Sequence, residues 1–231
     1  MLDINITNQL TWIFLFIALV VLLSFLRDKK IKIKKVIFFG DSITEFGVER
    51  GGYIAVMKEI LIQQNIKNYE LIGAGISGDT VQDLIARIKD VIVQSPDIVV
   101  LWIGANDVWQ QTDFTIEPDT LNFEKHYRVV IETLQKNKVQ LMLVTPAVIG
   151  EKKDNENPLD KNMNAYCEAI RTIADEFKLP LCDMRSFFQL YEMKHNRMNA
   201  NKGILTIDGV HLNDAGNRFA ANEILKVLKE V

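Results

Sequence analysis

The chain has 231 residues, of which 48% are hydrophobic and 25% are charged, a composition typical of a globular protein. Its formal net charge of -3 argues against a nucleic-acid-binding protein, which would present a strongly basic surface. The two cysteines, Cys167 and Cys182, form neither a Cys-x-x-Cys pair nor a disulfide framework, so they say little about the compartment.

The N-terminal residues 1–35 differ from the rest of the chain. The stretch from Leu10 to Leu26 contains no charge and no helix breaker, and as a helix it would measure about 25 Å, the short end of what crosses a bilayer core. A cleaved signal peptide is less favoured, because residues 1–5 are acidic and residues 24–27 make a poor cleavage site. We therefore expect an uncleaved, single-pass N-terminal membrane anchor.

Basic residues follow this segment and none precedes it: Arg27, Lys29, Lys30, Lys32, Lys34 and Lys35. The positive-inside rule places the remainder of the chain in the cytoplasm, although the extracytoplasmic side stays open. Residues 36–231 contain no Gly/Ser/Pro-rich linker and no internal repeat, so they are expected to form one domain.

In residues 36–231, strand and helix signals alternate. After a strand that ends at Ser42, the pattern predicts helices near 53–64, 81–91, 119–137, 159–177, 187–194 and 215–229, and strands near 69–72, 97–103, 141–145 and 179–183. This alternation predicts a three-layer α/β/α fold around a flavodoxin-like, doubly wound parallel sheet of about five strands. A charged loop at 150–157 is predicted to be mobile.

The first predicted strand has a distinctive end. The apolar run of residues 36–39 suits a strand buried on both faces, and it stops at Gly40-Asp41-Ser42. Ser42 is therefore expected in the crevice at the carboxyl ends of the strands, beside the N-terminus of the next helix. On this stretch alone, a serine or threonine that merely caps a helix is an equally good interpretation.

The three histidines have different sequence contexts. His126 falls in a charged helix, and His195 falls in a stretch that looks like solvated surface. His211 follows Asp208 by three residues, with Gly209 between them to let the loop fold back, so Asp208 can hold one ring nitrogen and leave the other as a base. Together with Ser42, this order of residues indicates nucleophilic catalysis.

Four blocks in this order resemble the SGNH, or GDSL-type, esterase and lipase family: residues 40–44, 75–80, 104–107 and 208–211. The resemblance covers roughly residues 35 to 231. One departure is Gly73, which stands where the family often has an asparagine.

The resemblance and the chemistry together give each residue a role. Ser42 would be the nucleophile, His211 the general base and acid, and Asp208 the group that orients the histidine. The backbone N–H groups of Ser42 and Gly78 and the side-chain amide of Asn106 would form the oxyanion hole. Asp41 and Asp79 are interpreted as carboxylates that fix loops, and no metal or other cofactor is expected.

These roles predict a serine hydrolase that cleaves carboxylic esters through an acyl-enzyme intermediate. The substrate would be an acyl or acetyl ester of a lipid, a glycan or a small molecule, and Trp109 would either line the acyl pocket or pack in the core. An acyltransferase that uses the same site and a non-enzymatic, membrane-tethered binding domain are the alternatives. Acyl chain length and oligomeric state are left open.

Overall fold

The computed structural model describes residues 12–17, 32–110 and 118–231, and the chain divides into two units, Met1–Lys32 and Ile33–Val231. In the first unit, residues 12–17 are helical with exposed side chains, and the rest of the predicted anchor at Leu10 to Leu26 lies outside the described residues. In the described part of the chain, no helix combines the length and the apolar character that a membrane crossing requires. The domain boundary after residue 35 stays a prediction.

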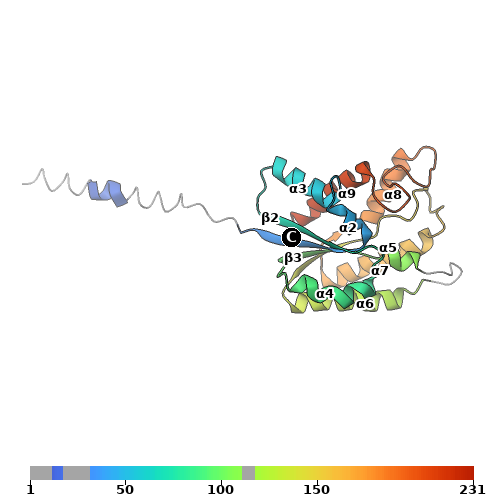
Figure 1. The fold of residues 1–231 in the computed structure, drawn as a ribbon, viewed down its shortest axis with the longest axis horizontal. Helices are drawn as coiled ribbons and strands as arrows, with labels where there is room; N and C mark the ends of the chain where they lie inside the picture. Colours follow the sequence, from blue (N-terminus) through green and yellow to red (C-terminus); the bar gives the residue numbers. More distant parts are fainter. Residues whose placement is uncertain (1–11, 18–31, 111–117) are drawn as a thin grey trace, which may run out of the picture. The chain divides into compact units, whose positions relative to one another are not determined.

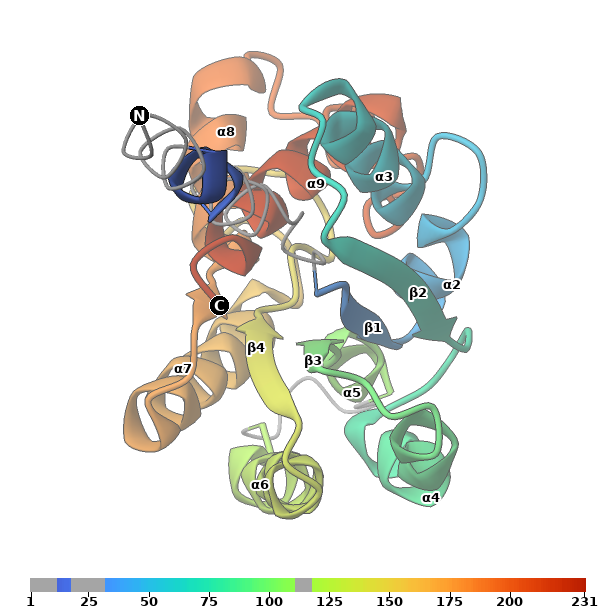
Figure 2. The same cartoon turned by 90° about the vertical axis from the view of Figure 1, so that its left-hand side faces the viewer.

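Within the described residues, the second unit contains a five-stranded sheet whose paired strands are all parallel. Its strands are β1 (Lys34–Gly40), β2 (Tyr69–Gly75), β3 (Ile98–Trp102), β4 (Gln140–Val144) and β5 (Leu181–Cys182). They lie in the order β2-β1-β3-β4-β5, so β1 is flanked by β2 on one side and β3 on the other (Figure 2). This is the flavodoxin-like order, and the predicted parallel five-stranded sheet is confirmed.

Helices cover both faces of the sheet (Figure 1). The helices α3 (Tyr53–Gln63), α8 (Met184–His195) and α9 (Asp214–Leu228) pack on one face, and α4 (Val81–Ile92), α6 (Thr120–Lys136) and α7 (Asp160–Phe177) pack on the other. In β1, Val36 and Phe38 point to the first face while Ile37 and Phe39 point to the second, and all four are fully buried. A strand covered on both sides explains why its sequence shows no polar alternation.

Two short helices were not predicted as separate elements: α2 (Ser42–Gly47) and α5 (Ala105–Trp109). Both begin just after a strand and lie at the carboxyl edge of the sheet (Figure 1). The strand β2 also runs further than predicted, through Gly75, because it keeps its register with β1 to the end of both strands. A Cβ on Gly75 would lie 2.2 Å from the backbone nitrogen of Glu45, so this glycine lets α2 pack directly onto β2.

The polar loop at 150–157 is charged, as predicted, and its residues 152 and 154–156 are exposed, but two of its side chains are buried. The side chain of Glu151 is fully buried and that of Asn157 is 6% exposed. The Nδ2 atom of Asn157 donates to the backbone oxygen of Lys152 and to the carboxylate of Asp160, each at 2.9 Å. These two buried side chains anchor the loop to the fold, and its mobility stays a prediction.

Candidate active site

The three predicted oxyanion residues follow three adjacent strands. Ser42 comes after β1, Gly78 after β2 and Asn106 after β3, and parallel pairing puts the carboxyl ends of these strands at one edge. Close packing between strands is required here, because a Cβ on Gly40 would lie 2.2 Å from the backbone oxygen of Trp102. Gly40 is therefore needed for this close approach.

Ser42 is the first residue of α2, and the helix cap is Asp41. One carboxylate oxygen of Asp41 accepts a hydrogen bond from the backbone nitrogen of Ile43 at 3.0 Å. The hydroxyl of Thr44 instead contacts the hydroxyl of Tyr53 at 3.1 Å inside the core. Neither Ser42 nor Thr44 is the cap, so the Ser42 hydroxyl remains available for chemistry.

Ser42, His211 and Asp208 form a continuous hydrogen-bonded chain. The Oγ atom of Ser42 lies 3.0 Å from Nε2 of His211, and Nδ1 of His211 lies 2.7 Å from Oδ2 of Asp208. The other carboxylate oxygen of Asp208 accepts from the backbone nitrogens of Val210 and His211 at 2.9 and 2.8 Å. The structure thus brings together the three residues predicted as catalytic, in the predicted order.

The charge on Asp208 is stabilised by its neighbours. Partial burial alone would raise the pKa of this carboxyl, but hydrogen bonds from the His211 ring and from the backbone of His211 and Val210 lower it to about 2. The carboxylate therefore stays charged through the pH range in which a histidine exchanges its proton. The other two histidines lie elsewhere, His126 on α6 and His195 at the end of α8 against Tyr191.

Asn106 is held by the loop that follows β2. Its Nδ2 atom donates to the backbone oxygen of Asp79 at 2.9 Å, which fixes the orientation of the amide. Both carboxylate oxygens of Asp107 accept from the backbone nitrogen of Val81 at 3.2 Å. An amide nitrogen carries two hydrogens, so Asn106 keeps a second N–H, and its side chain lines the cavity at Ser42.

Gly78 has the backbone conformation of a tight turn, with a φ of 87°, and no atom of the described residues, apart from Gly78 and its two chain neighbours, lies within 4 Å of the position that a Cβ would occupy. Its backbone oxygen accepts from Nε2 of Gln110 at 3.4 Å. Gly78 is not among the residues that line the cavity at Ser42. Its part in the oxyanion hole therefore stays a prediction, supported by its place beside the Asp79 backbone that holds Asn106.

Two acidic side chains have raised pKa values: Asp41, which precedes the nucleophile, and Asp107 in the first turn of α5. Burial raises the pKa of Asp41 to about 7, and the charge of Asp107 contributes to the same shift. Burial likewise raises the pKa of Asp107 to about 6. Asp41 and Asp107 both accept hydrogen bonds from backbone nitrogens. These hydrogen bonds offset part of the free-energy cost of burying the two carboxyl groups and fix the loops that contain them.

Arg87 is a structural residue that the sequence analysis missed. Its guanidinium donates to a carboxylate oxygen of Asp79 at 2.6 Å, to the backbone oxygen of Ala74 at 3.0 Å and to that of Gly40 at 2.8 Å. It also lies over the ring of Phe39, 4.6 Å from the centroid. The sequence signal that could have identified Arg87 was its position beside the apolar stripe of α4. Asp79 is confirmed as a residue that fixes a loop.

A cavity of about 720 Å³ opens at Ser42 and His211. The other polar residues that line this cavity are Asp41, Asn106, Lys152, Asn157, Asn201 and Asp208. Its apolar lining comes from two loops and the two short helices: Ile43, Ala105, Trp109, Ile149, Pro158, Leu159 and Val210. Trp109 is 60% exposed and lines this cavity, so the core-packing alternative for it is wrong.

A second groove, of about 420 Å³, shares Ile43, Asp208 and His211 with the cavity. It is bounded by Phe46, whose ring centroid lies 5.4 Å from that of His211, and by the polar side chains Glu49, Arg50, Asp214 and Asn217. The cavity and this second groove therefore meet at His211, and they are the two recesses of the site.

A parallel five-stranded sheet with a hydrogen-bonded Ser-His-Asp chain at its carboxyl edge defines a serine hydrolase. The GDSL-like Lipase/Acylhydrolase family matches residues 38–219, and the chain belongs to this family. It is a carboxylic ester hydrolase, as the sequence predicts.

Several characterised proteins are similar along most of their length. An acetylxylan esterase of Geobacillus stearothermophilus is 30% identical over 84% of this chain and 93% of its own. An isoamyl acetate-hydrolyzing esterase of Saccharomyces cerevisiae is 22% identical over 85% of this chain and 86% of its own. The crystal structure of an acetyl xylan esterase, AlAXEase, superposes with a TM-score of 0.79 at 48% identity, covering 83% of this chain and 98% of that one.

Proposed function

We propose that this esterase removes acetyl groups from the hydroxyls of a saccharide, with Ser42 as nucleophile, His211 as general base and acid, and Asp208 as the orienting carboxylate. The observation that carries the proposal is the hydrogen-bonded chain Ser42-His211-Asp208, with spacings of 3.0 and 2.7 Å, at the wall of a large cavity. The Ser42–His211 spacing lies within the range required for a general base to take a proton, and the His211–Asp208 spacing is that of a hydrogen bond that orients the base.

The reaction follows from this geometry. The Oγ atom of Ser42 attacks the ester carbonyl carbon while its proton passes to Nε2 of His211. When the tetrahedral intermediate collapses, His211 returns that proton to the departing alcohol oxygen, and the acetyl group remains on Ser42. Water then repeats the two steps and releases acetate. The free N–H of Asn106 and the backbone N–H groups of Ser42 and Gly78 are proposed to stabilise the oxyanion.

The two recesses suggest how the substrate lies. Since the departing oxygen must receive a proton from His211, the alcohol portion must lie against this histidine. The groove beyond His211 combines an exposed aromatic ring, Phe46, with a guanidinium, Arg50, and carboxylates that can hydrogen-bond to hydroxyls. A sugar ring has apolar faces and hydroxyl edges, so it suits this mixture better than an alkyl chain does.

The names of relatives support an acetyl ester. Two of the similar proteins are acetylxylan esterases and a third hydrolyses isoamyl acetate. All three are hydrolases, so the acyltransferase alternative is not favoured, and the assembled Ser-His-Asp chain argues against a non-enzymatic binding domain.

The anchor and its orientation belong to the proposal as well. The uncharged stretch Leu10 to Leu26 and the basic residues after it support a single-pass N-terminal anchor with the hydrolase domain, residues 36–231, in the cytoplasm. That orientation would suit oligosaccharides that enter the cell, whereas a polymeric substrate would need the opposite orientation. Protease protection of the domain in intact cells distinguishes the two.

Acetate release tests the substrate proposal. The full chain should hydrolyse acetylated xylo-oligosaccharides and p-nitrophenyl acetate, and activity should fall along a series of p-nitrophenyl esters with longer acyl chains. Ser42→Ala should lower kcat by a factor on the order of 10⁶ without unfolding the protein, because the hydroxyl forms the covalent bond. Faster hydrolysis of long-chain esters than of acetate esters would overturn the acetyl preference, and activity that persists in folded Ser42→Ala would overturn the mechanism.

A further inference from the structure

His211 and Asp208 do not lie at the end of a strand. They occupy an irregular loop, residues 204–213, between α8 and α9, and the base of this loop is an antiparallel bridge between Thr206 and Leu212. The backbone nitrogen of Ile207 donates to the oxygen of His211 at 2.8 Å, which closes the loop above that bridge. The position of Nε2 of His211 therefore depends on the contacts that hold residues 204–206 at the base of the loop.

Glu151 fixes them. One carboxylate oxygen accepts from the backbone nitrogen of Ile204 at 2.7 Å, and the other accepts from Leu205 at 2.5 Å and Thr206 at 2.8 Å. The Glu151 side chain is fully buried. Three consecutive N–H groups converge on one carboxylate, an arrangement in which each buried donor would be costly to leave without an acceptor.

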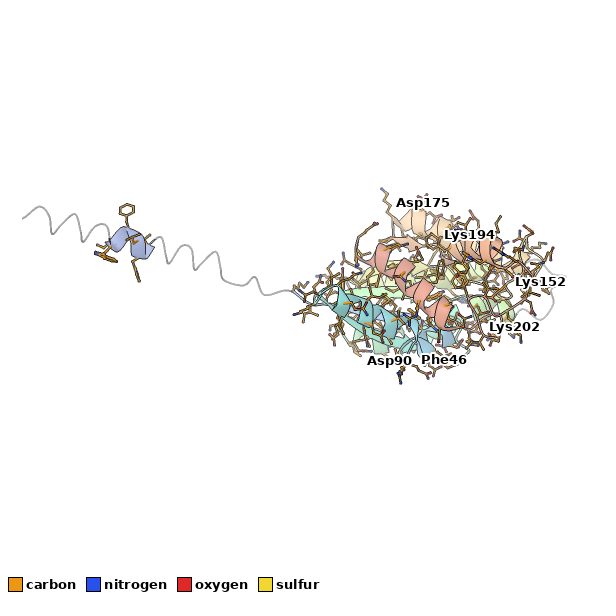
Figure 3. All side chains as sticks on the ribbon, turned by 90° about the horizontal axis from the view of Figure 1, so that it is seen from above. Phe46, Asp90, Lys152, Asp175, Lys194 and Lys202 are labelled. Carbon is orange, nitrogen blue, oxygen red and sulfur yellow. The ribbon has the colours of Figure 1, made fainter. Side chains whose placement is uncertain are left out.

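Glu151 is itself held on both sides. Its backbone nitrogen donates to the oxygen of Asn201 at 3.0 Å, and its backbone oxygen accepts from Nδ2 of Asn196 at 2.6 Å. The adjacent Gly150 donates its N–H to the oxygen of Gly209, inside the histidine loop, at 2.7 Å. The loop at 150–157 and the segment 196–213 are thus joined at one end of the domain, where Lys152 and Lys202 lie in Figure 3.

We propose that Glu151 is a positioning residue for the esterase reaction: its buried carboxylate sets the base of the histidine loop and so keeps Nε2 of His211 within reach of Ser42. This inference rests on the proposed roles of Ser42 and His211. It also explains why one carboxylate of this otherwise largely exposed polar loop is fully buried.

Glu151→Gln tests the proposal. The amide presents one acceptor oxygen and two N–H hydrogens to three N–H donors, so at least one donor loses its acceptor and the loop base shifts. A misplacement of about 1 Å costs on the order of 10²-fold in rate, so kcat per titrated active site on p-nitrophenyl acetate should fall by about 10² with KM nearly unchanged. The rate at which a fluorophosphonate labels Ser42 should fall by a similar factor, since labelling requires the same activation by His211.

The matched control is Glu156→Gln. Glu156 lies in the same loop and accepts from Nδ2 of Asn199 at 2.6 Å, but its side chain is exposed and does not hold residues 204–206. Its kcat and labelling rate should equal those of the wild type. All rates are measured at a temperature well below each variant's Tm, so that a lower stability by itself does not change kcat per titrated site.

The outcomes are distinct. A folded Glu151→Gln variant with wild-type kcat and labelling rate would overturn the proposal. If this variant does not fold, Glu151→Asp, which keeps the charge but is one methylene shorter, takes its place with the same expected loss. If neither variant folds, the proposal is also overturned, because Glu151 would then be required for folding rather than for placing the histidine. Phosphonate labelling needs no natural substrate, so a failure of the saccharide proposal would leave this test intact.

Discussion

The nucleophile turn, residues 40–47, and the histidine loop, residues 204–213, are built in different ways. In the turn, Ser42 is placed by β1, an interior strand of the sheet, and by the Asp41 cap, both within two residues of it in sequence. In the loop, His211 is placed by the carboxylate of Glu151, through hydrogen bonds to residues 204–206, which lie 53 to 55 positions later in the sequence. The Ser42-His211-Asp208 chain therefore joins a turn that is fixed by neighbouring residues to a loop that is fixed by contacts distant in sequence.

This difference suggests that changes in the two regions should have separable effects. Changes in the histidine loop should alter proton transfer, changes on the strand-end side should alter stabilisation of the oxyanion, and changes to the buried acids should alter stability with pH.

Asp208→Asn should have the largest of these effects, because it disturbs the tautomer and orientation of His211. In a serine protease with the same triad, the corresponding change lowers kcat by a factor of about 10⁴. We expect a loss of that order here, together with an altered pH dependence of kcat/KM. Steady-state kinetics across pH measure both. Asp175→Asn, on the exposed surface of α7 (Figure 3), is the control and should leave the profile unchanged. A loss below tenfold would show that Asp208 contributes little to the base.

Asn106→Ala should have a smaller effect of a different kind. It removes an oxyanion donor but no proton carrier, so kcat should fall by about 10² to 10³ with little change in KM and an unchanged shape of the pH profile. Gln110→Ala, which removes a long contact of 3.4 Å to the Gly78 oxygen, serves as the neighbouring control. A shifted pH profile, or an effect on KM alone, would instead assign Asn106 to substrate binding or to the histidine.

Asp41→Asn should change stability with pH. Burial raises the folded-state pKa of Asp41 from 3.8 to about 7, so the folded protein binds more protons than the unfolded chain between these values. The free energy of unfolding should therefore fall as the pH rises through this window. The asparagine keeps an acceptor for the Ile43 N–H and lacks the titration, so relative to wild type it should gain about 2 to 4 kcal/mol between pH 4 and pH 8. Urea unfolding at both pH values measures this, and parallel stability curves for the two proteins would contradict it.

Much of the site could be predicted from short stretches of sequence. The apolar run before Gly40 predicted a buried strand, and the parallel order of strands then required Ser42 and Asn106 to reach the same edge. Asp208 and His211 are three residues apart, so their pairing needed only a local turn. These are local patterns, in which hydrophobic periodicity and short spacings determine the geometry.

The remaining features depended on tertiary contacts. Arg87 was not identified because its three partners come from β1, β2 and the following loop, and an arginine on a helix normally indicates solvent exposure. Trp109 could not be assigned to the cavity or the core until the loops around α5 were placed.

Sequence by itself therefore determined the five-stranded parallel sheet, the family and the candidate residues Ser42, Asp208 and His211. The role of Glu151 in holding residues 204–206 could be recognised only from the tertiary structure. Its carboxylate is one among many charged groups in the sequence, and a charged side chain is normally expected at the surface. Only the folded chain brings three backbone N–H groups to it, because hydrogen bonds between distant segments leave no periodic pattern in the sequence.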